Sequence, residues 1–332
     1  FDWKKPDLRM NVAVARVTET GLPLAYVNQV GGQDELMFDG ASFVLNGDRR
    51  LAAQFPAWTE HVAVTEWARG DGGWSCVRGP IIKILDGDGA AYEACVLGLR
   101  DYVEKNRFPG VVLGLSGGID SALVAAMAVD ALGAARVHAV MMPYRYTSPR
   151  SIEDAKACAD ALGIKFDTVP IGPAVEALGT SLAPLFAGRA PDITEENIQS
   201  RVRGVIVMAI SNKFGAMVLT TGNKSEMSVG YATLYGDMNG GFNPVKDLYK
   251  LEVYRLARWR NAHVPGIGVG PSGIVIPESI IERPPTAELR ENQLDQDSLP
   301  PYERRQAAPG VKISSRNFGR DRRYPITNRF RE

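Results

Sequence analysis

The sequence predicts an α/β protein: a doubly wound parallel sheet with flanking helices, preceded by part of a second domain. Three observations predict it. Between about residues 89 and 220, apolar segments of strand length alternate with segments of helical periodicity. A glycine-rich loop, SGGIDS at residues 116–121, lies between one such strand and the following helix. Residues 1–75, in contrast, carry mainly short β-type segments separated by turns.

The first 75 residues are expected to contain strands but no helices. Apolar patterning predicts strands at 24–30, 41–45 and 61–67. Asn46-Gly47 predicts a turn, and the glycine-rich stretch 69–73 is expected to be a linker. A short β-rich segment of this kind indicates the end of a domain that begins before residue 1.

The second part, residues 76–332, alternates regularly. Helices are expected at 90–105, 121–132, 151–162 and 195–214. Strands are expected at 111–115, 137–142, 165–169 and 216–220. Strand–helix–strand units of this length form right-handed crossovers, which make the strands parallel and cover the sheet with helices. From residue 284 onward the chain is proline-rich and irregular, and it ends in a basic tail.

Composition excludes several classes of protein. The 332 residues suggest about two domains, and 38 basic against 38 acidic residues argue against a general nucleic-acid binder. An apolar fraction of 45% argues against disorder, and no apolar run reaches the roughly 18 residues that span a membrane. Three scattered cysteines, Cys76, Cys95 and Cys158, favour a reducing compartment, so a cytoplasmic location is expected.

The strongest chemical signal is the segment Gly114-Leu115-Ser116-Gly117-Gly118-Ile119-Asp120-Ser121. Its glycines permit a tight turn and close approach to a ligand, and the N–H groups that open the next helix attract an anion. A loop at the carboxyl end of a parallel strand is where doubly wound folds bind nucleotides. It matches neither GxxxxGK[ST] nor GxGxxG. The alternative is a simple turn in which Asp120 or Ser121 caps the helix.

The SGGIDS loop resembles the pyrophosphate-binding loop of the ATP pyrophosphatases. Three further segments resemble NAD synthetases within that group: TTGNKSE at 220–226, YGDMNGGFNPVKDLYK at 235–250 and PTAEL at 285–289. YVNQVGGQDELMFDGAS at 26–42 resembles the end of the nitrilase-type glutaminase domain of the glutamine-dependent branch. The resemblance implies an adenine nucleotide alpha hydrolase-like fold for residues 76–332. It also implies that residues 1–75 are the end of a nitrilase-like sandwich plus a linker.

The resemblance also implies site residues. ATP would be bound by Gly114, Leu115, Ser116, Gly117, Gly118, Ile119, Asp120, Ser121, Thr221, Lys250 and Thr286. Deamido-NAD would be bound by Asn197, Arg201, Glu226, Asp237 and Asn243. Asp120 and Glu226 would hold Mg²⁺, a cation that prefers oxygen ligands. The alternatives are a turn with capping residues around Glu226 and a solvated surface lysine at position 250.

The implied activity is that of a carbon–nitrogen ligase catalysing the final step of NAD biosynthesis. ATP would activate deamido-NAD as an adenylate, and ammonia would complete NAD with release of AMP. In the complete protein the ammonia would come from glutamine. The resemblance implies Lys5 as a glutamine contact, and the alternative is an ordinary surface lysine. The glutaminase cysteine would precede residue 1. Homodimers or larger homo-oligomers are expected, with no nucleic-acid or membrane partner.

Two features of the C-terminal region depart from the family pattern. Glu303 stands where a lysine precedes an arginine pair, and a helical stretch of tens of residues is expected between Glu303 and Arg304. The basic tail 304–332 is expected to cover the active site or contact another subunit rather than RNA. Two alternatives to the ligase stay open: a tRNA-modifying ATP pyrophosphatase and a nucleotide-binding regulatory protein.

Overall fold

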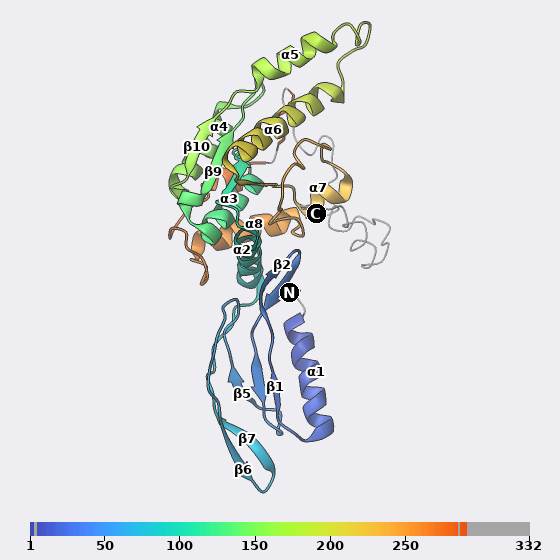
Figure 1. Cartoon of the computed structure of the whole chain (residues 1–332). Helices are drawn as coiled ribbons and strands as arrows, with labels where there is room; N and C mark the ends of the chain where they lie inside the picture. Colours follow the sequence, from blue (N-terminus) through green and yellow to red (C-terminus); the bar gives the residue numbers. More distant parts are fainter. Residues whose placement is uncertain (3–4, 285, 291–332) are drawn as a thin grey trace. The chain divides into compact units, whose positions relative to one another are not determined.

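The computed structural model describes residues 1–2, 5–284 and 286–290. It divides into two compact units (Figure 1), each described below by itself. Unit 1 comprises Phe1–Asn106 and Pro265–Gly268, and unit 2 comprises Arg107–Val264 and the chain from Val269 onward. The domain boundary expected at residue 75 stays a prediction. In the described part of the chain, no helix is long and apolar enough to cross a membrane.

Unit 2 is built on a four-stranded parallel sheet, as predicted. The strands are β8 (Val111–Gly114), β9 (Val137–Met141), β10 (Lys165–Thr168) and β11 (Met217–Leu219). They lie in the order β10-β9-β8-β11, and every neighbouring pair is parallel. The chain therefore moves outward from β8 to β10 and then returns to the other side of β8.

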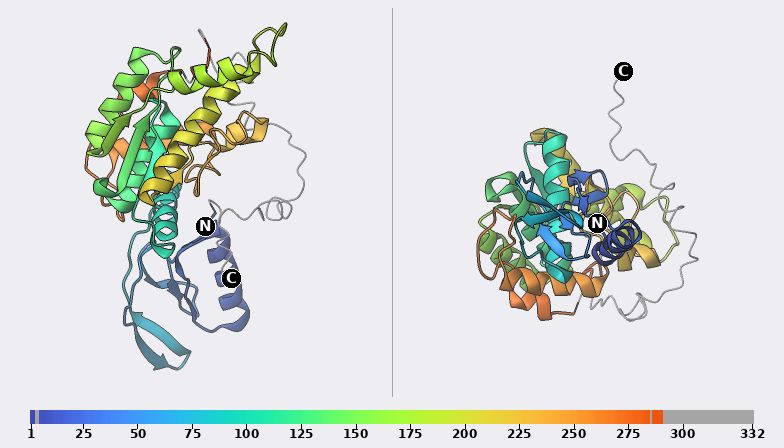
Figure 2. Two further views of the ribbon diagram at one scale, coloured as in Figure 1. Left: turned by 45° about the horizontal axis from the view of Figure 1, so that its top comes forward. Right: turned by 90° about the horizontal axis from the view of Figure 1, so that it is seen from below.

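The helices of unit 2 cover both faces of this sheet (Figure 2). Helices α3 (Ile119–Leu132) and α4 (Pro149–Leu162) contact each other and the strands β8 to β10. Helix α6 (Ile193–Phe214) packs Val207 against valines of three strands, Val112, Val140 and Val218. Since crossovers are right-handed, the reversal of direction after β10 requires α6 to lie on the face opposite α3 and α4.

Several helices of unit 2 were not expected from the sequence. They are α5 (Gly172–Leu182), α8 (Lys250–Ala262), α9 (Glu278–Glu282) and the short 3₁₀ helix η1 (Ala134–Arg136). Helix α7 (Lys224–Val229) opens close to Glu226, as expected. Reciprocal capping boxes begin α6, through Asp192 and Glu195, and α7, through Asn223 and Glu226. Such caps satisfy N–H groups that the first helical turn leaves without partners.

Unit 1 contains a helix where none was expected. Helix α1 (Lys5–Thr20) packs Ala13 and Val17 against Phe43 and Leu45. The underlying antiparallel sheet has the order β1-β4-β5, formed by β1 (Leu24–Tyr26), β4 (Phe43–Leu45) and β5 (Leu51–Gln54). The prediction of a helix-free segment was therefore wrong. The helical signal is weak because α1 buries only these two side chains fully.

Two hairpins in unit 1 also differ from the prediction. Strands β6 (Glu66–Gly70) and β7 (Gly73–Arg78) pair across the stretch that was expected to be a linker. Residues 61–65 are not a strand, and Val62 and Val64 are 96% and 86% exposed. Strands β2 (Val30–Gln33) and β3 (Leu36–Asp39) form a hairpin that contacts α2 (Gly87–Lys105).

A buried ion pair joins two helices of unit 2. The Arg260 guanidinium of α8 contacts the Asp130 carboxylate of α3 at 2.6 and 3.0 Å, and neither side chain is exposed. Arg260 also donates to the carbonyl of Pro271 at 2.6 Å. Because both charges are desolvated, the pair tolerates the loss of one partner poorly.

We expect Asp130→Asn to lower the free energy of unfolding by about 3–5 kcal/mol, because the Arg260 charge then stays buried without its counter-ion. Urea denaturation followed by circular dichroism measures this change. The matched control is Asp160→Asn, which removes a carboxylate from an ion pair with Lys156 whose two side chains are both 63% exposed. It should cost less than about 1 kcal/mol. Equal losses in the two variants would contradict the expectation.

Candidate nucleotide-binding site

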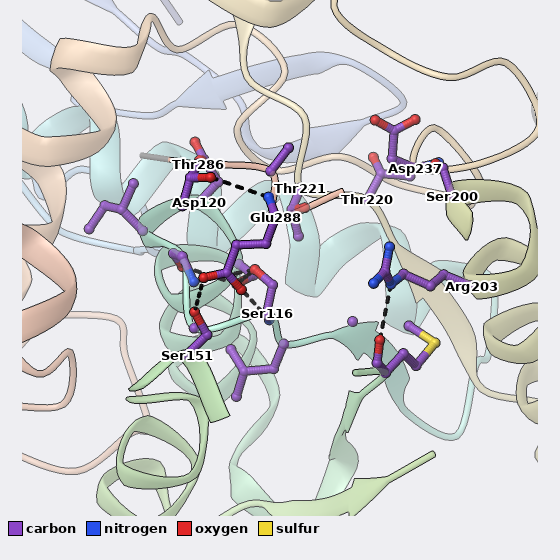
Figure 3. Close-up of a pocket in the computed structure, with 18 of the residues that line it drawn as sticks. Ser116, Asp120, Ser151, Ser200, Arg203, Thr220, Thr221, Asp237, Thr286 and Glu288 are labelled. Carbon is purple, nitrogen blue, oxygen red and sulfur yellow. Dashed lines mark hydrogen bonds between the residues drawn. The ribbon is translucent and has the colours of Figure 1, made fainter. Parts of the chain in front are cut away.

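A cavity of about 330 Å³ lies at the carboxyl ends of β8, β9 and β11 (Figure 3). It forms between β8 and β11, where the strand order reverses, and such a point is the usual ligand crevice of an open parallel sheet. Most of the predicted site residues line it: the loop 114–121, Thr221, Glu226, Asp237, Lys250 and Thr286. Asn197, Arg201 and Asn243 are not among the lining residues. Lys5 begins α1 in unit 1 and is exposed.

The glycine-rich loop is held in shape by its own serines. The Ser121 hydroxyl accepts from the Ser116 N–H at 3.2 Å and donates to the Gly118 carbonyl at 3.0 Å. Gly117 has φ +80°, and a Cβ built there would lie 2.3 Å from the Ser151 carbonyl oxygen. Glycine is therefore required at this position both for the left-handed backbone and for the close approach of α4.

Neither Asp120 nor Ser121 caps helix α3. The N-cap is Gly118, and no side chain accepts from the first-turn N–H groups. Asp120 points instead toward the cluster formed by Asn223, Glu226 and Lys250. Its Oδ1 accepts from Asn223 Nδ2 at 2.9 Å, and its Oδ2 contacts Lys250 Nζ. The interpretation of Asp120 as a simple cap does not describe this arrangement.

Lys250 is shared by two carboxylates. Besides Asp120, its Nζ lies 3.6 Å from Glu226 Oε1. The Lys250 side chain is only 3% exposed, and its backbone N–H donates to the Ser225 hydroxyl at 3.0 Å. Lys250 is thus not a solvated surface lysine. Two acidic groups and one ammonium lie beside a loop whose backbone suits phosphate, an arrangement that can bind a charged nucleotide and a cation.

Asn243 and the preceding glycines shape the wall around Thr221. Gly241 N–H donates to the Val218 carbonyl at 2.8 Å, and Thr220 N–H donates to the Phe242 carbonyl at 3.0 Å. Asn243 Nδ2 donates to the Gly222 carbonyl at 2.7 Å. The structure therefore places Asn243 behind the turn that follows β11, where it holds Thr221 toward the cavity.

The other predicted dinucleotide contacts hold a loop against α6. Asn197 Oδ1 accepts from the Thr233 hydroxyl at 2.9 Å, and Arg201 Nε donates to the Leu234 carbonyl at 3.2 Å. Asp237 lines the cavity from the same loop, and its N–H donates to the Ser200 hydroxyl at 3.0 Å. Burial raises the pKa of the Asp237 carboxyl above its usual value, although backbone N–H groups partly oppose this.

Thr286 belongs to a segment fastened over the cavity by Glu288. The Glu288 carboxylate accepts from the Ser148 N–H at 3.2 Å and the Ser151 hydroxyl at 2.9 Å, and it pairs with Arg283 at 2.6 Å. The Glu288 N–H donates to the Thr286 hydroxyl at 3.3 Å. Sequence reasoning missed these contacts, although Glu288 lies within the PTAEL segment that it singled out.

Arg203 was also missed. It lies on α6 two residues after Arg201, and its Nε donates to the Met142 carbonyl at 3.0 Å. Its guanidinium lines the cavity. Desolvation lowers the pKa of Arg203 to about 10, so it stays charged at neutral pH. Sequence spacing gave no signal for Arg203, because α6 turns residue 203 by about 200° from the predicted contact Arg201.

The chain is similar to known proteins over most of its length. The family model described as NAD synthase matches residues 91–306. A glutamine-dependent NAD(+) synthetase of Rhodobacter capsulatus is 52% identical over 371 aligned residues, which cover 99% of this chain and 67% of the relative. The Xanthomonas campestris protein of the same name is 50% identical, covering 94% of this chain and 63% of the relative. The chain thus spans about two thirds of the length of these curated relatives.

A solved structure gives the same result. The glutamine-dependent NAD+ synthetase of Acinetobacter baumannii, determined in complex with ADP, superposes with a TM-score of 0.79 at 46% sequence identity. That match covers 86% of this chain and 53% of the solved one. The family model takes in the SGGIDS loop and Lys250, and it extends through Glu288. On the strength of the parallel sheet, the loop and these similarities, the chain belongs to the NAD synthase family.

Proposed function

We propose that the chain catalyses the ATP-dependent amidation of deamido-NAD to NAD through an adenylate, releasing pyrophosphate and AMP. This is the final step of NAD biosynthesis. The observation that carries the proposal is the position of the SGGIDS loop beside the Asp120–Lys250–Glu226 cluster, at the point where the strand order reverses. The relatives' name, glutamine-dependent NAD(+) synthetase, supports NAD as the product and favours this ligase over a tRNA-modifying enzyme.

The chemistry requires alignment of two nucleotides rather than a protein nucleophile. A carboxylate oxygen of deamido-NAD attacks the α-phosphorus of ATP, and the bond to the leaving pyrophosphate breaks. Ammonia then attacks the activated carbonyl carbon, the bond to AMP breaks, and the nitrogen loses a proton. The loop N–H groups would hold phosphate oxygens, and Lys250 would stabilise negative charge near the reacting centre.

The charges of the cavity suit a magnesium-bound nucleotide. The described lining contains four carboxylates, Asp120, Glu226, Asp237 and Glu288, against three cations, Arg203, Lys250 and Arg283. Asp120 and Glu226 would hold Mg²⁺ together with ATP oxygens, because this cation is often bound through one or two carboxylates plus substrate phosphates. When bound, it would neutralise negative charge on the phosphates.

The remaining expectations concern the dinucleotide and the rest of the protein. Asp237 would contact deamido-NAD directly. Asn197, Arg201 and Asn243 would contact it from positions where they also hydrogen-bond the loops around the cavity. Glutamine as nitrogen source, Lys5 as a glutamine contact, a homo-oligomeric state and a cytoplasmic location stay predictions. The segment between Glu303 and Arg304 and the basic tail lie outside the described residues.

The 332-residue chain should form NAD and AMP from ATP, Mg²⁺ and deamido-NAD when ammonium is supplied. Glutamine should not replace ammonium, because Cys76 and Cys158 are buried, burial raises the pKa of Cys158 to about 12, and the half-buried Cys95 lies in the middle of helix α2. Chromatography of NAD and AMP in matched reactions measures both products. A folded sample that makes no NAD from ammonium would refute the proposed function.

We expect Lys250→Met to lower kcat by about 100-fold or more, because Asp120 and Glu226 lose their shared counter-ion and the developing charge loses its stabilising group. The matched control is Lys224→Met, which removes a lysine 2.8 Å from the exposed Asp247 carboxylate. It should retain kcat within about twofold. Thermal melting separates a kinetic loss from unfolding, and a folded Lys250→Met variant with normal kcat would contradict the assigned role.

A further inference from the structure

The cavity contains a cation that the loop chemistry does not use, Arg203. Its Nε is fixed by the Met142 carbonyl at the end of β9, at 3.0 Å. This contact anchors the edge of the guanidinium. Figure 3 shows Arg203 on one side of the cavity and Ser116 and Asp120 on the other. The terminal nitrogens of Arg203 are therefore oriented by the fold and not by a bound ligand.

Those terminal nitrogens have no hydrogen-bond or ion-pair partner among the residues that the structure describes. The other two cations of the lining are engaged. Lys250 is paired with Asp120 and Glu226, and Arg283 is paired with Glu288. The Glu288 carboxylate also acts on the Arg203 charge, but it already accepts from Arg283, Ser148 and Ser151.

A desolvated guanidinium with free donors is costly unless an anion completes it. Figure 3 shows Ser200, Thr220 and Asp237 on the same side of the cavity as Arg203, but within the described residues no hydrogen bond or ion pair joins them to its terminal nitrogens. A planar fork of N–H donors matches the oxygens of a phosphate, and it does so better than an ammonium. The half-buried Arg203 therefore presents terminal donors that are available to an anionic ligand entering the cavity.

We propose that Arg203 binds phosphate oxygens of a nucleotide substrate, as a contact separate from the SGGIDS loop and Lys250. The inference rests on the proposed function, because both substrates of that reaction, ATP and deamido-NAD, carry phosphates. Arg203 would hold one of them across the cavity from the loop. Its fixed fork would help to keep the two nucleotides in mutual alignment.

Equilibrium binding to the whole 332-residue chain tests this contact without turnover. Calorimetric titrations with Mg²⁺-ATP, deamido-NAD and adenosine are compared for the wild type and Arg203→Gln. We expect the affinity for ATP or deamido-NAD to fall about 10- to 100-fold, and the affinity for adenosine to stay unchanged. The ligand that loses affinity identifies which phosphates Arg203 binds.

Two further variants separate binding from folding. Arg203→Lys keeps the charge but not the fork, so it should recover only part of the lost affinity. Lys213→Gln removes an exposed cation from the same helix and should bind all three ligands as the wild type does. Unchanged affinity of Arg203→Gln for both ATP and deamido-NAD would overturn the proposal. So would an equal loss for adenosine, which indicates a structural defect.

The outcome is independent of the ligase test. If wild-type chain binds ATP but forms no NAD from ammonium, the proposed function fails, while a selective phosphate defect in Arg203→Gln still supports the contact. If NAD forms and Arg203→Gln binds both substrates normally, the contact fails and the proposed function stands.

Discussion

The reversal of strand order between β8 and β11 is the constraint on which unit 2 depends. Right-handed crossovers carry the chain from β8 to β10 along one face, and the return to β11 requires α6 to cover the other face. The loops that follow β8 and β11 consequently diverge and leave a cavity between them. Glycine at position 117 lets the loop after β8 lie directly against α4 at the edge of that cavity.

Ion pairs then connect segments of unit 2 that the backbone fold brings near one another. Asp120 follows β8, Glu226 opens α7 and Lys250 opens α8, so one ion cluster links three separate parts of the chain. Asn223 completes it, because its side-chain Oδ1 accepts from the Glu226 N–H and caps α7 while its Nδ2 donates to Asp120. Asn223 and Glu226, which form the capping box of α7, thus also hold the charges that line the cavity.

Periodicity predicted the parallel sheet of unit 2 because its strands are continuous apolar segments and its main helices are long. It failed in unit 1, where α1 buries few side chains and where the alternating Val62 and Val64 are exposed rather than packed. Motifs identified the loop and Lys250. They could not identify Arg203 or Glu288, whose contacts, with Met142 and Ser148, depend on how distant segments pack rather than on local spacing.

The N-termini of α3 and α4 both lie at the cavity of unit 2, and their positive ends are neutralised from different parts of the chain. The N-terminus of α4 carries Ser148 as its cap and also receives the Glu288 carboxylate, so its positive end is already neutralised from within the protein. The N-terminus of α3 is capped by Gly118, which offers no side chain. The first turn of α3 instead contains Asp120, so both N-termini lie beside a carboxylate of the chain that is itself paired with a cation, Asp120 with Lys250 and Glu288 with Arg283. The carboxylate at α3 belongs to that helix, whereas the carboxylate at α4 comes from a segment 140 residues away, so the N-terminus of α4 is neutralised only while that segment lies against it.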